Sequence, residues 1–402
     1  MAMSRRDFLV TASASLGALA VPATLLRARP ARASGSAPVL VALYLRGGAD
    51  ALNLVPPHGD AAYYTARPRI RVAPGTQLDL DGFFGFHPGL APLHPFYRNG
   101  RLAVLHACGS ASGTRSHFDA QDFMEFAAPD NKTIQVGWLN RFLTAAGTTS
   151  PISAITIENQ PAKALVGPVS TMAIPALSRF SLEGTYTTER RQAIQTISRA
   201  TTNSLLRVMG GSTTLDVLDL VQSINTATNI TYPTTRLGSA LKDLAALIKV
   251  DVGVRVAAVN HANWDHHANE TTAFPEMAGD LAGSLAAFAT DLGSDLDRTV
   301  VLVMSEFGRR VAENGALGSD HGHGGVMLAL GGAVQGGQVL LRNDTWPGLA
   351  PARLYQGIDL AGTTDFRDVF AEVLDRHMGL NNPSPVFPNY TLDIARYPGL
   401  FT

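Results

Sequence analysis

Nearly uninterrupted apolar runs divide the chain into segments. Residues 37–45, 102–107 and 299–304 consist almost entirely of apolar, mostly β-forming side chains. Such runs are typical of strands that are buried on both faces, as in a parallel sheet. The same reasoning predicts further strands at residues 152–158, 254–260, 326–330 and 338–341.

Helical patterns fill several of the intervals between these runs. Apolar residues recur at helical spacing over residues 278–292. A helix is expected at residues 118–126, with Ser116 as its N-cap, and another at residues 365–379, with Asp365 as its N-cap. Because strands alternate with helices, the pattern predicts an α/β fold with a mostly parallel sheet covered by helices on both faces.

The stretch from about residue 180 to residue 250 has a different pattern. It contains expected helices at residues 187–209 and 234–248, separated by a segment rich in Thr, Ser and Asn. We predict that this stretch is a helical insertion within one large domain, residues 34–402. It would serve either as a cap that sets specificity or as a connection.

The first 33 residues have the features of an export signal. The twin arginine of Ser4-Arg5-Arg6-Asp7-Phe8-Leu9 precedes a weakly apolar run, and Ala31-Arg32-Ala33 matches a cleavage pattern. The alternative is a retained membrane anchor, since the run is almost long enough to span a bilayer. Pro22, the many small residues and the cleavage pattern favour removal. We therefore expect a periplasmic or extracellular protein that engages the twin-arginine translocase during export and keeps no stable membrane span.

Charge and cysteine content exclude several classes of protein. The 32 basic and 33 acidic residues leave a net charge of −1, whereas nucleic-acid-binding proteins carry a basic surplus. The single cysteine, Cys108, excludes an intramolecular disulfide and any metal site built from several cysteines. We expect no nucleic-acid partner.

Polar clusters follow the predicted strands, which is where open α/β sheets bind ligands. Each cluster also has a simpler interpretation, as a turn, a helix cap or a solvated loop. The clusters are Gly47-Gly48-Ala49-Asp50, residues 114–119, residues 261–267, Ser305-Glu306-Phe307-Gly308-Arg309 and residues 318–325.

Histidine and aspartate are concentrated in two of these clusters. Residues 261–267 hold three His and one Asp, and residues 318–325 hold one Asp and two His among glycines. Imidazole and carboxylate groups are common ligands of zinc and manganese. A ligand set rich in oxygen and nitrogen suits a two-ion hydrolytic site better than a structural zinc site. The sequence contains no P-loop, G-x-S-x-G, H-E-x-x-H or G-x-G-x-x-G helix-opening motif.

Five ordered motifs together resemble the DUF1501 family of twin-arginine-exported proteins, which is placed with the alkaline phosphatase-like and sulfatase-like superfamily. They are LYLRGGADALN (43–53), SHFDAQDFME (116–125), NWDHH (263–267), SEFGRR (305–310) and GSDHGHGG (318–325). The resemblance spans residues 38–380. It implies a three-layer αβα sandwich with a metal site, usually of two ions, at the carboxyl edge of the sheet.

The resemblance also implies roles for individual residues. Ser116 matches the hydroxyl nucleophile, and Glu306 would be an extra ligand or a supporting base. The implied metal ligands are Asp50, Asp265, His267, Asp320, His321 and, as the candidate last histidine, His323.

This sequence departs from the superfamily pattern in three respects. Asp265 and His267 are two residues apart where four is typical, and His377 is the only histidine after His323. The absence of a Cys/Ser-x-Pro-x-Arg motif argues against a formylglycine sulfatase.

These observations predict an exported, metal-dependent hydrolase of phosphate or sulfate esters. Ser116 would attack a small-molecule or envelope-associated ester, and two divalent cations (zinc, manganese or calcium) would assist. Arg46, Arg115 and Arg309 would bind the oxyanion, because a guanidinium offers paired donors. The unusual ligand spacing keeps open a catalytically degenerate exported binding or scaffold protein on the same fold. A transferase that uses the same nucleophile is a third alternative.

Overall fold

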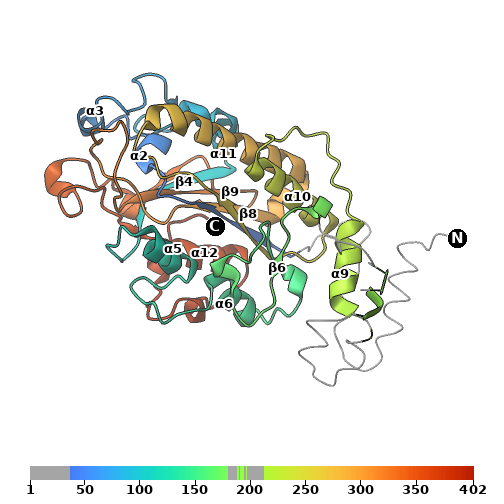
Figure 1. Cartoon of the computed structure of the whole chain (residues 1–402). Helices are drawn as coiled ribbons and strands as arrows, with labels where there is room; N and C mark the ends of the chain where they lie inside the picture. The colour runs from blue at the N-terminus through green and yellow to red at the C-terminus, as the bar shows by residue number, and fades with distance from the viewer. Residues whose placement is uncertain (1–36, 180–187, 190, 194–195, 197–211) are drawn as a thin grey trace.

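The computed structural model describes residues 37–179, 188–189, 191–193, 196 and 212–402 (Figure 1). The predicted export signal, residues 1–33, lies outside the described residues. So does most of the helix predicted at residues 187–209.

In the described part of the chain, a nine-stranded sheet forms the centre of the molecule, in the order β10-β4-β9-β8-β1-β7-β5-β6, with β11 also paired to β4. The strands are β1 (Val39–Leu45), β4 (Leu102–Gly109), β5 (Ala154–Thr156), β6 (Met172–Ala173), β7 (Val256–His261), β8 (Thr299–Met304), β9 (Gly325–Gly331), β10 (Val339–Leu340) and β11 (Thr364–Asp365). All pairings are parallel except those of β9, which runs antiparallel to both β4 and β8. The predicted mostly parallel sheet is therefore confirmed.

Strand β1 shows why the sequence pattern is continuous rather than alternating. All seven of its residues are buried. Val41 and Leu43 belong to the apolar cluster on one face of the sheet, while Leu40 and Ala42 belong to the cluster on the other face. Successive side chains of a strand point to opposite faces, so a strand covered on both faces requires apolar residues throughout.

Helices cover both faces of the sheet and complete the predicted three-layer αβα arrangement (Figure 1). In the view of Figure 1, the upper layer contains α2 (Ala51–Leu54), α10 (Arg236–Val250) and α11 (Glu270–Leu292). The lower layer contains α5 (His117–Glu125), α6 (Trp138–Ala145) and α12 (Phe366–Glu372). Smaller elements are α3 (Ala61–Ala66), the hairpin of β2 (Leu78–Asp79) and β3 (Gly85–Phe86), the 3₁₀ segment η2 (Pro88–Leu93), α4 (His94–Arg98) and α9 (Ser212–Gln222).

Several elements differ from their predicted bounds. Helix α11 begins eight residues before the predicted start. The added part contains Pro275, and its buried Phe274 extends the apolar repeat by one turn. Helix α12 has the predicted cap, Asp365, but ends at Glu372, where the π-helical turn η9 (Val373–His377) continues the chain. Within the predicted insertion, α10 packs against α11 and contributes Leu241 and Leu244 to the apolar cluster of the upper layer. In the described ranges, we find no helix long and apolar enough to cross a membrane.

Candidate metal centre

The polar clusters meet at one edge of the sheet because of the strand directions. The loops that follow β1, β7 and β8 leave the sheet at the same edge, since these three strands are parallel. Strand β9 is antiparallel to β8, so the loop that leads into β9 also lies at this edge. Helix α5, which follows β4, begins there as well, because β4 is parallel to β8 through their shared neighbour β9.

Two glycines after β1 allow these loops to approach closely. Gly47 and Gly48 have φ angles of +122° and +68°, which side chains with a Cβ rarely adopt. A Cβ on Gly47 would lie 2.6 Å from the backbone nitrogen of Asp265, and a Cβ on Gly48 would collide with the Phe307 ring. The predicted tight turn is thus also the place where three loops pack together.

Three side chains from three different segments of the chain form a compact group that could hold a metal ion. One ligand atom from each of His117, Asp265 and His321 lies within 4.8 Å of the others. Nε2 of His117 is 3.3 Å from Oδ2 of Asp265, and Nε2 of His321 is 3.1 Å from Oδ1 of the same carboxylate. Two imidazoles and one carboxylate are a common ligand set of catalytic zinc sites, which keep a further position open.

Glu306 orients His117. Its Oε1 lies 2.9 Å from Nδ1 of His117, and it also accepts hydrogen bonds from the backbone of Gly47 and from Gln121. These bonds outweigh the effect of burial and hold the pKa of Glu306 below its usual value, while the bond to Glu306 raises the pKa of His117. With Nδ1 donating to Glu306, Nε2 of His117 faces Asp265 as a buried atom without a hydrogen bond.

The backbone carbonyl of Arg115 orients His321 in the same way. It accepts from Nδ1 of His321 over 2.9 Å, which turns Nε2 toward Asp265. Nε2 of His267 lies 2.8 Å from Nε2 of His321 and 3.1 Å from Asp265. His267 therefore adjoins the group from its solvent side and is a candidate fourth ligand. Asp320, predicted as a ligand, lies behind His267, 3.3 Å from its Nδ1, and bonds Asn314.

Arg309 holds the carboxylate of Asp265 in place. Nη2 of Arg309 donates to Oδ1 of Asp265 over 2.5 Å, and its other donors bond the carbonyls of Gly47, Gly48 and Ser319. Burial disfavours the charged carboxylate, but the bonds from Arg309 and His321 prevail and keep the pKa of Asp265 well below its usual range. The site thus contains a carboxylate that stays ionised at neutral pH.

The three arginines that were predicted to bind the oxyanion contact protein groups in the structure, and their oxyanion-binding role stays a prediction. Arg309 is fully buried and its donors are bonded to protein atoms, so it supports the loops. The guanidinium of Arg46 pairs with Glu125 at 2.8 Å and bonds Asn260. That of Arg115 pairs with the buried Asp359.

His323 does not join the metal group. Its Nδ1 accepts the backbone N–H of Gly362 at 3.1 Å, and its Nε2 lies 2.9 Å from the carbonyl oxygen of Ser110. The ring also stacks on Tyr355 with centroids 4.0 Å apart. Since both ring nitrogens bond the backbone, His323 lies apart from the group of three, and its role as a ligand stays a prediction.

Asp50 also takes part in a different network. Its buried carboxylate caps α2 through the N–H groups of Leu52 and Asn53 and pairs with the buried Arg67 at 2.5 Å. Burial opposes the charge of Asp50, but Arg67 outweighs it and lowers the pKa of the carboxyl group. The contacts of Asp50 are thus those of a cap and an ion pair, and they differ from the ligand role that the sequence predicts.

Ser116 occupies the predicted position immediately before α5 and next to His117. Its Oγ accepts the N–H of Asp119 at 3.5 Å, which is the contact of a helix cap. Sequence reasoning did not select His117 or Arg67. The signal for His117 was its place beside Ser116 in a motif after β4, whereas Arg67 stands in an exposed-looking polar segment without such a signal.

A protein-family model matches this chain, and several solved structures are similar to it. A family model described as a protein of unknown function (DUF1501) matches residues 37–388. No curated protein sequence matches. Similar solved structures include the C-terminal periplasmic domain of EcEptC from Escherichia coli in complex with zinc, at 12% identity, 74% coverage of each chain and a TM-score of 0.32. Another is a mutant of TAB5 alkaline phosphatase with magnesium bound, at 11% identity, 74% coverage of this chain, 92% of that chain and a TM-score of 0.32.

Proposed function

The chain belongs to the DUF1501 family, and from the chemistry of His117, Asp265 and His321 we propose that it is a metal-dependent hydrolase of phosphate or sulfate esters. The observation that supports this proposal best is the fixed orientation of the two imidazoles. Glu306 and the Arg115 carbonyl each bond an Nδ1 atom, so both Nε2 atoms turn toward one ionised carboxylate.

These residues fit a divalent cation such as zinc or manganese. Hydrogen bonds to the outer nitrogen of a ligating histidine set its tautomer and its basicity, and both histidines have such a bond. A cation held there supplies positive charge beside the ester oxygens and increases the acidity of a neighbouring hydroxyl group. The residues are sufficient for one ion, and we propose His267 as the ligand on the solvent side.

We propose Ser116 as the nucleophile. Its hydroxyl stands next to His117 in the chain, at the start of a helix whose first N–H groups favour an anionic group nearby. The bond from Asp119 to Oγ is long, at 3.5 Å, so little hydrogen-bond energy opposes rotation of the hydroxyl toward a substrate. Attack by Oγ on phosphorus or sulfur would release the alcohol, and water would then cleave the serine ester.

We further propose that residues 1–33 direct export by the twin-arginine route and are removed, so that the enzyme acts on small-molecule or envelope-associated esters outside the cytoplasm. The paired Arg5-Arg6 and the Ala31-Arg32-Ala33 pattern support this part of the proposal.

The test combines metal content with activity. Protein from the exported fraction is analysed for bound metal and then assayed on p-nitrophenyl phosphate and p-nitrophenyl sulfate, with and without chelator. Wild-type protein should hold about one ion per chain, and His117→Ala and His321→Ala should lose it. His94→Ala, on α4 away from the site, is the matched control and should keep metal and activity.

Ser116→Ala separates the nucleophile from the metal site. It should keep the ion and lose hydrolysis by two orders of magnitude or more, that is roughly 3 kcal/mol of transition-state stabilisation. Full activity of Ser116→Ala would refute the nucleophile but leave the metal site intact. Metal binding without turnover of any ester would favour the binding or scaffold protein.

A further inference from the structure

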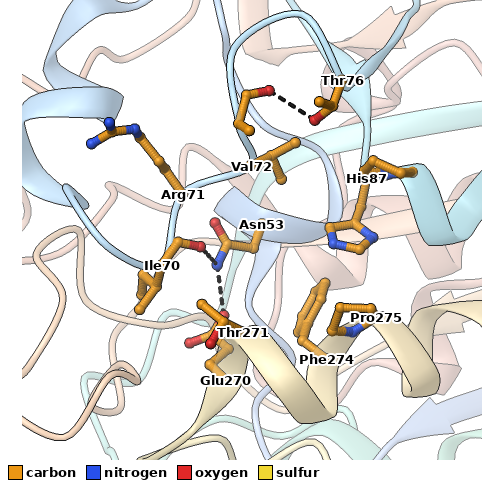
Figure 2. A pocket seen from close by; sticks show the side chains of 12 residues that line it. Asn53, Ile70, Arg71, Val72, Thr76, His87, Glu270, Thr271, Phe274 and Pro275 are labelled. Carbon is orange, nitrogen blue, oxygen red and sulfur yellow. Dashed lines mark hydrogen bonds between the residues drawn. The ribbon is translucent and has the colours of Figure 1, made fainter.

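A concave site lies on the α11 side of the sheet, apart from the metal centre. It is a pocket of about 160 Å³ between α2, residues 70–76, the start of η2 and the first turns of α11 (Figure 2). None of the residues that line it belongs to the group of His117, Asp265 and His321. Its volume is close to that of a protein cavity that accommodates benzene, so a six-membered ring fits.

Much of the pocket lining is apolar. Ile70 and Val72 stand on one side, and Phe274 and Pro275 of α11 stand on another. Ile70, Val72 and Phe274 are themselves buried, so their positions are fixed by the surrounding core. These side chains would contact the hydrocarbon part of a ligand and gain from its removal from water.

His87 presents a single hydrogen-bond donor to the pocket. Its Nδ1 accepts the backbone N–H of Gly89 over 2.9 Å, and its ring packs edge-on against Phe274 with centroids 5.2 Å apart. With Nδ1 occupied as an acceptor, the proton of the neutral ring resides on Nε2. Within the described residues, no protein atom accepts a hydrogen bond from this Nε2, and Figure 2 shows the ring facing the pocket.

On the opposite, polar wall, the amide of Asn53 has all its hydrogen bonds made within the protein. Nδ2 of Asn53 donates to Glu270 at 2.7 Å and to the carbonyl of Ile70, and its Oδ1 accepts from Tyr63. Burial raises the pKa of the Glu270 carboxyl group, and burial lowers the pKa of His87 to about 4. His87 is therefore neutral near pH 7, and burial disfavours the charged form of Glu270. Arg71, which also lines the pocket, turns its guanidinium away from it and bonds the carbonyls of Tyr64 and Pro68 (Figure 2).

We propose that this pocket binds a small uncharged molecule that has one acceptor oxygen, a ketone or an alcohol, on an apolar body the size of a six-membered ring. The oxygen accepts from Nε2 of His87, and the ring lies against Val72 and Phe274. Hydrogen bonds run from the pocket toward the metal centre, because the carbonyl of Ser319 accepts from Arg309, which in turn bonds Asp265. Asn53 bonds Glu270, and Glu270 accepts from the hydroxyl of Ser319, the residue before Asp320.

Cyclohexanone is the probe for the test, and cyclohexanecarboxylate is its charged counterpart. Binding to the wild-type protein is measured by ligand-observed NMR, together with the ¹⁵N shift of His87. For seven heavy atoms we expect a dissociation constant of about 1–10 mM for cyclohexanone. The carboxylate should bind at least ten-fold more weakly.

Two substitutions on neighbouring positions of α11 locate the site. Thr271 lines the pocket and Thr272 does not, and both are exposed. Thr271→Trp fills the pocket and should weaken cyclohexanone binding ten-fold or more, whereas Thr272→Trp should leave it unchanged. Metal content serves as a check that both variants are folded. No saturable binding up to 50 mM (about five times the weakest expected constant) would overturn the proposal. So would binding that Thr271→Trp leaves intact, or a preference for the carboxylate.

Discussion

The guanidinium of Arg309 donates to the carboxylate of Asp265, with Nη2 and Oδ1 2.5 Å apart. The two residues come from the loops that follow β8 and β7. The same guanidinium bonds carbonyls of the loop after β1 and of the segment that leads into β9. One buried side chain thus joins four segments and fixes the carboxylate at the centre of the site.

Arg309→Lys should destabilise the protein and weaken metal binding together. A lysine has one donor atom and cannot reach the same carbonyls, so buried acceptors would lose their bonds. We expect a loss of about 3 kcal/mol or more in the free energy of unfolding, measured by urea denaturation. Arg310→Lys, at the half-exposed neighbour, should change it by about 0.5 kcal/mol or less. A loss below about 1 kcal/mol for Arg309→Lys would show that the loops are held in other ways.

Glu306→Gln tests the orientation of His117. The substitution keeps the size of the side chain but removes the charge that bonds Nδ1. Partners of ligating histidines typically account for about 10- to 100-fold in metal affinity, and we expect a loss in this range by competitive zinc titration. Glu313→Gln is the control, since Glu313 pairs with Arg69 away from the site. Unchanged zinc affinity in Glu306→Gln would mean that His117 is not a ligand.

Asp50→Asn distinguishes an ion pair from a metal ligand. Removing the charge leaves Arg67 buried without a partner, which typically costs about 3–5 kcal/mol of stability. Because Asp50 lies outside the group around Asp265, metal content per folded chain should not change. Elemental analysis of the folded fraction measures this. If the folded variant lost the ion, Asp50 would be a metal ligand after all.

Because the ring of His106 is buried, we expect the protein to lose stability as the pH falls. Burial lowers the pKa of its ring to about 4 in the folded protein, while an unfolded histidine titrates near pH 6.5. Between these values the unfolded chain binds a proton that the folded chain does not. Stability should therefore be full above about pH 6.5 and fall toward pH 4, by at most about 1.4 kcal/mol per pH unit from this residue.

The measurement is urea denaturation at pH 7.5, 6.5 and 5.5. A His106→Phe variant cannot take up the proton, and its ring can still contact Phe84 and Trp346. It should show a shallower decline with acidity than the wild type. Parallel declines would assign the acid sensitivity to other groups.

The strands and the three layers could be predicted because burial on both faces demands a local signal. Each residue of β1 must be apolar, and that requirement is visible in seven consecutive positions. Strand direction has no such signal. The reversed direction of β9 depends on pairing with β4 and β8, more than twenty residues away at the nearest.

The location of the candidate site could be predicted from the sequence. The identity of its ligands could be predicted only in part. His321 and His323 stand on either side of Gly322, and their residue type does not distinguish them. What separates them is distant backbone: His321 meets the carbonyl of Arg115, and His323 meets Ser110 and Gly362. In the same way, Glu306 selects His117 from 189 positions away. Residue type alone does not carry this information.

The three candidate ligands come from α5, the loop after β7 and the segment before β9, which stand far apart in the chain. A cation would therefore bind only where these three parts of the chain have already come together, and it would have little affinity for the unfolded chain. By mass action, each ten-fold rise in free cation above its dissociation constant would add about 1.4 kcal/mol to the free energy of unfolding of the whole domain. The free energy of unfolding of the domain would then depend on the cation concentration of the compartment in which the protein works.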